Sequence, residues 1–375
     1  MSKPKAIVIG AGIVGLASAK ALAEKGFSVK VFERGTIASG ASVRNFGMIW
    51  PIGQPDGTLY ARALRSREVW KIISDTGAFW SDPVGSLHVA HHPKEWTVLQ
   101  ELYESFKADR PVKLLTAEQI AETNPAVVQT NLYGGLYNAD ELIVDPRLAI
   151  AALPAYLSEV HAVEFYWNKC VSYIADNTVY VGNEEDYEAD MIFICSGADF
   201  ETLYPEDFAR FPLTKCKLQM MRLIAQPDHS RIGPALCGGL SLIHYNSFKV
   251  ADSLSQLRGY YEAEMEQYLD WGIHVMACQN EAGEITIGDS HEYGNTHDPF
   301  DKASINQMII DYLQKFTSFK DYTITESWNG VYPKLTNGDT ELFFSPESGV
   351  YVLNGLGGAG MTLSFGLAEE VVAGL

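Results

Sequence analysis

A chain of 375 residues, of which 47% are hydrophobic and 20% are charged, is long enough to build two domains with substantial cores. Its formal net charge of −19 argues against a nucleic acid partner and against an anionic membrane surface, because both attract basic stripes.

The cysteines and the two ends of the chain indicate a cellular compartment. Five scattered cysteines form no C-x-x-C pair and no zinc-like spacing, which is typical of reduced thiols in a cytoplasmic protein. The first apolar run begins within five residues of the N-terminus, which leaves no room for a signal peptide. The glycine-rich C-terminal stretch contains Glu369 and Glu370 and is a poor membrane span. We therefore expect a cytoplasmic protein with no membrane partner.

The first predicted element is a short buried strand followed by a glycine-rich turn. An apolar run over 6–9 leads into Gly10, Gly12 and Gly15, then into a helical pattern and a second apolar run that ends at Glu33. This is the G-x-G-x-x-G arrangement of a Rossmann-like dinucleotide site, in which a pyrophosphate approaches the backbone at the start of a helix. The acid disfavours the 2′-phosphate of NADP, but it does not distinguish NAD from FAD.

The middle of the chain alternates helices and strands. Thr116 and Asp145 are good N-caps, and the run over 191–195 is apolar throughout, as in a buried parallel strand. The strands over 163–165, 171–174 and 179–181 are expected to form a three-stranded antiparallel excursion. Further strands are expected over 86–90, 218–224, 273–278 and 284–288, and helices over 60–73, 95–106 and 304–316, from 116 and from 145.

The chain ends on a second strand, glycine loop and helix, over 350–353, 355–360 and 361–372. Core strands of the nucleotide domain therefore come from both ends of the sequence. We expect an α/β fold in which a Rossmann-like domain carries an inserted, sheet-rich α+β substrate domain. The first domain is assigned to 1–81, 141–212 and 324–375, and the second to 82–140 and 213–323.

Four motifs in this order resemble the D-amino-acid oxidase superfamily of flavoproteins, which includes glycine oxidase and sarcosine oxidase. They are the first glycine turn with Glu33, the Ala41-Ser42-x-x-Asn45-x-Gly47 loop, the Cys195-Ser196-Gly197-Ala198 strand end, and the C-terminal Gly355…Gly360-Met361-Thr362 loop. The sequence is most similar to a branch of FAD-dependent oxidoreductases linked to phosphonate breakdown. The stretches over 42–55, 288–294 and 360–366 carry that likeness.

The resemblance implies non-covalent FAD. Glu33 would hold the adenosine ribose with Arg34 beside it, and Val171 would bind adenine through its backbone. No cysteine follows Cys278, so the flavin linkage of sarcosine oxidase has no counterpart. The residues implied to bind FAD are Gly10, Gly12, Ile13, Val14, Gly15, Glu33, Arg34, Ala41, Ser42, Arg44, Asn45, Gly47, Met48, Val171, Ser196, Gly197, Leu356, Gly357, Gly358, Ala359, Gly360, Met361 and Thr362.

The resemblance also implies oxidation of a small-molecule amine, with hydride transfer to the flavin, hydrolysis of the imine and reoxidation by O2. Amino-acid oxidases of the family read the substrate carboxylate with an arginine in a G-x-R-P motif, where this chain has Tyr332. We therefore expect an aminoalkylphosphonate such as 2-aminoethylphosphonate or its N-methyl form. The candidate substrate residues are Tyr332, His291, His274, Arg44, Trp50 and Gly358.

Other interpretations stay open. The substrate could instead be an amino acid whose carboxylate is bound by a differently placed cation, as in a glycine, sarcosine or D-amino-acid oxidase. The chain could also be an NAD-dependent dehydrogenase or a flavin-bearing protein without catalysis, and the stretch over 289–293 could be only a polar turn. His88, His91 and His92 have no metal-ligand spacing and no acid set beside them, so no metal site is expected.

Overall fold

Strand β1 (Lys5–Ile9) lies inside a six-stranded sheet, in the order β20-β21-β13-β1-β2-β9. This computed structural model describes residues 3–182 and 185–375. All neighbouring strands of the sheet run parallel except β20, which pairs antiparallel with β21. Strands from both ends of the chain therefore meet in one sheet, as predicted. The other strands are β2 (Ser28–Glu33), β9 (Glu164–Trp167), β13 (Met191–Ile194), β20 (Leu342–Glu347) and β21 (Val350–Asn354).

One pairing prediction was wrong. The chain over 163–165 is not part of an antiparallel excursion, because β9 pairs in parallel with β2 and Phe165 lies opposite Val31. Helix α5 (Pro146–His161) precedes β9 and acts as the crossover that brings a parallel strand to the sheet edge. The antiparallel excursion is instead a separate sheet of β10 (Val171–Ala175), β11 (Thr178–Val181) and β12 (Glu185–Glu188).

Helices α1 (Ile13–Glu24), α2 (Thr58–Asp75), α5 and α10 (Gly360–Ala373) belong to this first unit. Their apolar side chains join the central strands in one buried cluster that includes Leu16, Trp70 and Phe365. The predicted cap of α5 is present, because the Asp145 carboxylate accepts the backbone N–H of Arg147 at 3.0 Å. Among the described residues, no helix is long and apolar enough to cross a membrane.

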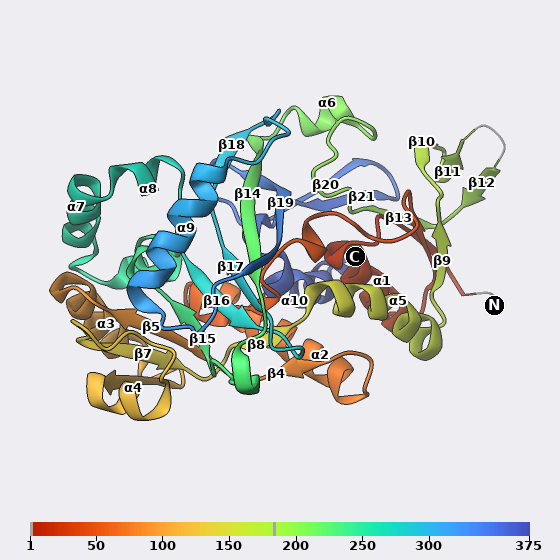
Figure 1. Ribbon diagram of the computed structural model, residues 1–375. Coiled ribbons are helices and arrows are strands. Elements are labelled where there is room, and N and C mark those ends of the chain that lie inside the picture. Colours follow the sequence, from red (N-terminus) through yellow and green to blue (C-terminus); the bar gives the residue numbers. More distant parts are fainter. Residues whose placement is uncertain (1–2, 183–184) are drawn as a thin grey trace.

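The second unit is built on a nine-stranded sheet, in the order β18-β14-β17-β16-β15-β5-β7-β6, with β19 also paired to β14. Figure 1 shows it to the left of the first unit, with α3, α7, α8 and α9 on its outer side. Its strands are β5 (Ser86–Ala90), β6 (Val112–Thr116), β7 (Gly134–Asn138), β14 (Leu213–Leu223), β15 (Ala235–Cys237), β16 (Met276–Gln279), β17 (Ile285–Gly288), β18 (Glu292–Gly294) and β19 (Ile324–Leu335). Its helices are α3 (Pro93–Phe106), α4 (Ala117–Thr123), α7 (Leu254–Glu264), α8 (Glu266–Asp270) and α9 (Ala303–Phe316).

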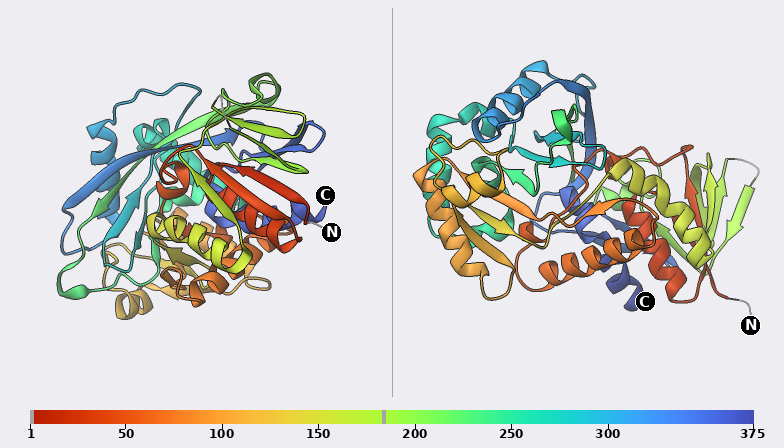
Figure 2. Two further views of the ribbon diagram at one scale, coloured as in Figure 1. Left: turned by 90° about the vertical axis from the view of Figure 1, so that its right-hand side faces the viewer. Right: turned by 60° about the horizontal axis from the view of Figure 1, so that its bottom comes forward.

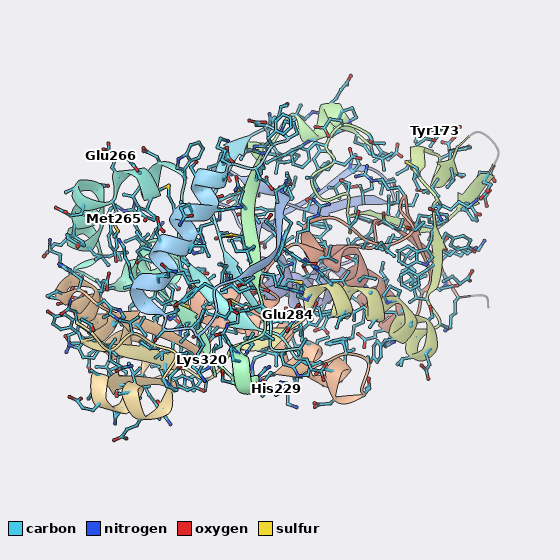
Figure 3. The ribbon with its side chains drawn as sticks, in the orientation of Figure 1. Tyr173, His229, Met265, Glu266, Glu284 and Lys320 are labelled. Carbon is cyan, nitrogen blue, oxygen red and sulfur yellow. The ribbon has the colours of Figure 1, made fainter. Side chains whose placement is uncertain are left out.

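A short connecting layer and several loops complete the fold. Strands β3 (Met48–Ile49), β4 (Ser81–Asp82) and β8 (Leu142–Val144) form a three-stranded sheet. Helix α6 (Pro205–Phe208) leads from the first unit into β14. The two units lie side by side in the second view of Figure 2, and Tyr173 on β10 and Met265 beside α8 lie at opposite ends of the molecule in Figure 3.

Two long antiparallel strands join the units. β14 and β19 are paired from Leu213 opposite Leu335 to Leu223 opposite Ile324. The division of the chain into domains stays a prediction. The predicted boundary at 324 gives β19 to the first domain, whereas β19 pairs with β14 of the second sheet.

Candidate active site

A cavity of about 1160 Å³ is lined by residues of both units. Its walls come from the turn after β1, the loop over 38–48, the end of β13, the strands β14 and β19, the loop before α10, and the second sheet near His274 and His291. All the predicted cofactor and substrate residues line this cavity except Gly15 and Gly47. Residues that are far apart in the sequence are therefore brought to one site.

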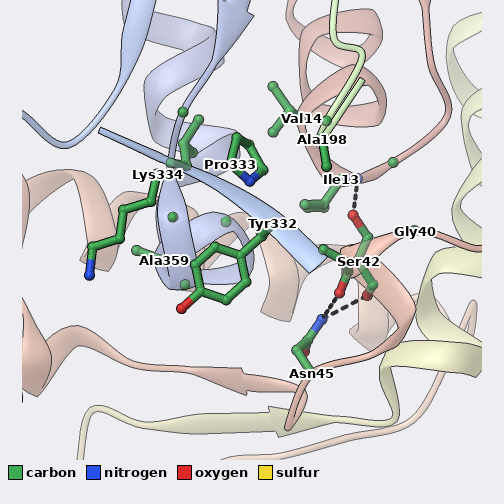
Figure 4. A pocket seen from close by; sticks show the side chains of 18 of the residues that line it. Ile13, Val14, Gly40, Ser42, Asn45, Ala198, Tyr332, Pro333, Lys334 and Ala359 are labelled. Carbon is green, nitrogen blue, oxygen red and sulfur yellow. Dashed lines mark hydrogen bonds between the residues drawn. The ribbon is translucent and has the colours of Figure 1, made fainter. Parts of the chain in front are cut away.

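The first glycine turn leaves little space for side chains at its glycine positions. Gly10 has a φ of +103°, and a Cβ there would lie 2.4 Å from the backbone oxygen of Cys195. A Cβ at Gly12 would lie 3.1 Å from Ser42 Oγ, and that hydroxyl accepts the backbone N–H of Ile13 at 2.9 Å (Figure 4). The backbone at the start of α1 is thus open to a ligand only because residue 12 has no side chain.

Gly15 and Gly47 serve packing and do not line the cavity. A Cβ at Gly15 would lie 1.9 Å from the backbone oxygen of Gly10, inside the turn itself. Gly47 has a φ of +76°, and a Cβ there would lie 2.0 Å from the backbone oxygen of Val144. Both glycines let a cavity-lining segment lie directly against a neighbouring backbone.

The Glu33 carboxylate holds the glycine turn in place through hydrogen bonds to the backbone. One carboxylate oxygen accepts the N–H of Ala11 at 3.0 Å, and the other accepts the N–H of Gly35 at 2.9 Å. The side chain lines the cavity at the end of β2, where the ribose is expected. Arg34 pairs with Asp199 at 2.8 Å and so links β2 to the end of β13.

The loop over 41–48 is held by its own asparagine. Asn45 Nδ2 donates to the backbone oxygens of Ala41 at 3.0 Å and Ser42 at 2.9 Å, and Oδ1 accepts the N–H of Gly47 at 2.7 Å (Figure 4). This short polar side chain keeps the loop turned toward the start of α1. The predicted Ala-Ser-x-x-Asn-x-Gly motif is thus a self-bonded loop on the cavity wall.

The C-terminal loop places a second helix start at the cavity. Asn354 Nδ2 donates to the backbone oxygen of Gly197 at 3.0 Å, and Oδ1 accepts the N–H of Gly355 at 2.7 Å, so the ends of β13 and β21 are tied together. Thr362 Oγ1 accepts the N–H of Trp50 at 2.9 Å. Helices α1 and α10 thus both begin at the cavity, where free N–H groups and the helix dipoles favour an anionic ligand.

Residues 5–373 match the model of the DAO family, described as FAD dependent oxidoreductase. The chain belongs to this family. As an FAD dependent oxidoreductase it has the fold of glycine oxidase from Geobacillus kaustophilus, with a TM-score of 0.78 and 20% identity over 100% of this chain and 95% of that one. L-alpha-glycerophosphate oxidase from Mycoplasma pneumoniae, with FAD bound, gives a TM-score of 0.73 and 17% identity over 100% and 96% of the two chains.

A curated relative matches a part of the chain only. The tRNA 5-methylaminomethyl-2-thiouridine biosynthesis bifunctional protein MnmC of Burkholderia ambifaria is 31% identical over 143 residues, which are 35% of this chain and 21% of that protein. The residues at the cavity fit the family's cofactor. The cradle that a Cβ at Gly12 would fill leaves room for a pyrophosphate, and the two helix starts face the same cavity.

The FAD dependent oxidoreductase has a buried tyrosine in the wall of this cavity. Tyr332 on β19 is 7% exposed, and its side chain lies between the loop of Ala359 and the loop of Asn45 (Figure 4). A Cβ at Gly358 would lie 3.6 Å from its hydroxyl, which is an ordinary van der Waals contact, so Gly358 is a neighbour of this hydroxyl in the cavity wall. Burial raises the pKa of Tyr332 well above its usual value, which keeps the hydroxyl protonated and able to donate.

Arg44 and Trp50 line the cavity in different ways. Arg44 is exposed, and its guanidinium donates to the backbone oxygen of Asn329 at 3.1 Å, which ties the loop to β19. Trp50 is 5% exposed, and its indole N–H has no hydrogen-bond partner among the described residues. The tryptophan therefore forms an apolar wall, and the arginine lies at the rim of the cavity.

His274 and His291 are brought together beside Asp289 and a third histidine, His244. His274 Nε2 lies 3.1 Å and His291 Nε2 lies 3.9 Å from the Asp289 carboxylate, and the ring centroids of His244 and His274 are 3.8 Å apart. Burial lowers the pKa of His291 to about 4 and those of His244 and His274 well below 6.5, whereas burial raises the pKa of Asp289. We call these four residues the histidine cluster.

Sequence reasoning missed several lining residues. Lys334 lies two residues after Tyr332 on β19, half-buried at the cavity, and its Nζ is 3.0 Å from the Tyr293 hydroxyl. The two-residue period of a strand places both side chains on one face, and that signal was available in the sequence. Tyr245, next to His244, gave no comparable signal, because it follows a short 3₁₀ helix (Gly239–Ile243).

Proposed function

We propose that this FAD dependent oxidoreductase oxidises the C–N bond of a small aminoalkylphosphonate, such as 2-aminoethylphosphonate or its N-methyl form. Bound FAD supplies the two-electron acceptor for the hydride that leaves the carbon next to nitrogen. Water then hydrolyses the imine to an aldehyde and releases ammonia from the primary amine or methylamine from the N-methyl form, and O2 takes the two electrons and two protons to give hydrogen peroxide. An amine that arrives neutral needs no protein base for this step.

The pair of Tyr332 and Lys334 carries the proposal. Arginine forms a planar, bidentate fork with a carboxylate, and a single tyrosine hydroxyl cannot replace that fork. A phosphonate is tetrahedral and offers three acceptor oxygens, so it suits donors that are spread in space around a compact charge. Tyr332 and the lysine–tyrosine pair of Lys334 and Tyr293 supply such donors on one wall of the cavity.

The local charge also favours an anionic head group despite the net charge of −19. Lys334 and Arg44 line the cavity, and α10 directs its N-terminus to it, whereas the start of α1 is taken by the expected pyrophosphate. Helix N-termini and nearby cations act over a few ångströms, whereas long-range repulsion from surface carboxylates is screened by salt over about 8 Å at physiological ionic strength. The glycerophosphate oxidase, a protein of this fold, takes by its name a phosphate-bearing substrate.

The amine half of the proposal rests on the fold and on the partial relative. Glycine oxidase shares the fold over the whole chain, and the name of the MnmC relative contains a methylaminomethyl group, which has the C–N bonds of a secondary amine. A glycine- or sarcosine-type oxidase is the outcome that competes with the proposal in its test.

The test is anaerobic reduction of the bound flavin, followed as bleaching at about 450 nm. The yellow protein is mixed with 2-aminoethylphosphonate, with β-alanine as the matched carboxylate and with ethylamine as the matched amine without a head group. The proposal predicts fast bleaching by the phosphonate and slow bleaching by the other two. Faster bleaching by β-alanine or by glycine would overturn the phosphonate assignment.

A further inference from the structure

The histidine cluster has a donor set that a phosphonate site does not require. One nitrogen each of His244, His274 and His291 lies within 4.8 Å of the others, and the Asp289 carboxylate lies beside them. His274 is 4%, Asp289 is 5% and His291 is 6% exposed. Imidazole nitrogens that converge in this way are typical ligands of a transition-metal ion.

One buried polar atom of the cluster has no partner. His274 Nδ1 makes no hydrogen bond with any described residue, whereas Nε2 of the same ring lies 3.1 Å from Asp289 Oδ1. Buried polar atoms are nearly always paired, and an unpaired one indicates a water, an ion or a functional role. An unpaired nitrogen in a cluster of three histidines at a cavity wall therefore indicates a missing ligand.

The tautomer of His291 suits a metal ligand. Its Nδ1 lies 2.9 Å from the backbone oxygen of Gly272, and since a carbonyl only accepts, Nδ1 carries the proton. Nε2 therefore keeps its lone pair on the side of Asp289. Histidine ligands in metal sites commonly donate their second ring N–H to a backbone oxygen or a carboxylate in this way.

The spacing is close to that of a bound ion. Nitrogen ligands of a tetrahedral Zn²⁺ lie about 3.4 Å apart at Zn–N distances of about 2.1 Å. The three nitrogens lie within 4.8 Å of one another. Side-chain rotations that move each nitrogen by about an ångström would bring them to the separation found around a bound ion.

We propose that His244, His274 and His291 bind a divalent transition-metal ion such as Zn²⁺ at the wall of the substrate cavity, with Asp289 beside them as a neighbour of His274 and not as a ligand. Three imidazoles leave at least one coordination position open to the cavity, as in metal sites that bind a substrate oxygen. An anionic substrate oxygen is the fitting ligand for that position, and this second part rests on the proposed function. The ion site itself does not depend on which substrate is oxidised.

The first experiment measures metal binding directly. Tag-free, FAD-loaded protein is stripped with a chelator, dialysed against micromolar Zn²⁺, and analysed for zinc by mass spectrometry. We expect about one ion per chain in the wild type, and at least a tenfold lower content in His291→Ala. The matched control His161→Ala, at the end of α5 and outside the cavity-lining residues, should keep the wild-type content. Wild-type protein with less than a tenth of an ion per chain, or equal contents in all three proteins, would overturn the proposal.

Cobalt replaces zinc in the second experiment and requires no variant. The visible absorption of Co²⁺ added to wild-type protein should show nitrogen coordination, which keeps the proposal testable if His291→Ala fails to hold FAD. Absorption like that of hydrated Co²⁺ would overturn it. Methylphosphonate should then change the Co²⁺ spectrum. An unchanged spectrum would overturn the proposal that an anionic substrate oxygen binds the ion, but not the ion site itself. Neither measurement depends on substrate turnover.

Discussion

Alanine at Gly12 and alanine at Gly15 should have opposite effects on cofactor binding and on folding. Both glycines belong to the same G-x-G-x-x-G turn, so sequence alone treats them alike. Gly12 has a φ of −71° and a ψ of 174°, which any residue can adopt, so only space requires glycine there. Gly15 lies inside α1, and the backbone oxygen of Gly10 occupies the position that its side chain would take.

The two contacts set the expected magnitudes. A Cβ at Gly12 would meet only Ser42 Oγ, at 3.1 Å, and a shift of this side chain by a few tenths of an ångström relieves the contact, so the cost to the folded protein should stay below about 1 kcal/mol. A Cβ at Gly15 would lie 1.9 Å from a backbone oxygen that cannot move without opening the turn. Overpacking of that kind costs about 3 kcal/mol. The methyl group at residue 12 instead occupies the cradle that the pyrophosphate must enter.

Two assays separate these effects. Urea unfolding of the flavin-free proteins gives the free energy of unfolding, and quenching of flavin fluorescence gives the Kd for FAD. We expect Gly12→Ala to unfold like the wild type and to bind FAD at least tenfold more weakly, a loss of about 1.4 kcal/mol. Gly15→Ala should lose about 3 kcal/mol of stability. Unchanged FAD affinity in Gly12→Ala would refute the assignment of the cradle, and a stable Gly15→Ala would refute the packing argument.

Three further predictions concern the cofactor, the substrate and the fold. Acid or heat should release all the flavin from the yellow protein, because the sequence has no cysteine after Cys278, and flavin that stays with the precipitate would contradict this. Tyr332→Phe should lower kcat/KM for 2-aminoethylphosphonate about tenfold by removing one hydrogen bond, but leave kcat/KM for ethylamine unchanged. Burial raises the pKa of Glu141 from its usual 4.5 to about 7, so the stability that its protonated form contributes is lost as the pH rises through this range. Urea unfolding from about pH 4 to about pH 8 should show the wild type losing up to about 3 kcal/mol relative to Glu141→Gln, and a difference that does not change with pH would contradict this.

Features that depend on backbone geometry could be predicted from the sequence. Gly10 and Gly12 lie on the cavity wall, where a left-handed φ at Gly10 and a close contact at Gly12 favour glycine, and their role in cofactor binding stays a prediction. The capping residue Asp145 is confirmed for the same kind of local reason, since a helix start needs a side-chain acceptor. Such features depend on a few residues that are neighbours in the sequence, so the sequence alone predicts them.

Features that depend on tertiary contacts could not be predicted in the same way. The pairing of β9 with β2 depends on which sheet edge is free where the chain leaves α5. The residues over 163–165 do not indicate which edge that is. The histidine cluster combines residues from a 3₁₀ helix end, a strand start and a strand end. Sequence reasoning looked for metal ligands at His88, His91 and His92, which are neighbours in sequence.

The central claim is that the anionic group of the substrate is a phosphonate, and one set of steady-state rates tests it most directly. The kcat/KM values of wild-type protein are measured side by side for 2-aminoethylphosphonate, its N-methyl form, glycine, sarcosine and D-alanine, with oxygen consumption as the readout. We predict that one of the two phosphonates exceeds every carboxylate by more than tenfold, which is about 1.4 kcal/mol of transition-state binding. A tenfold advantage for glycine, sarcosine or D-alanine would contradict the claim.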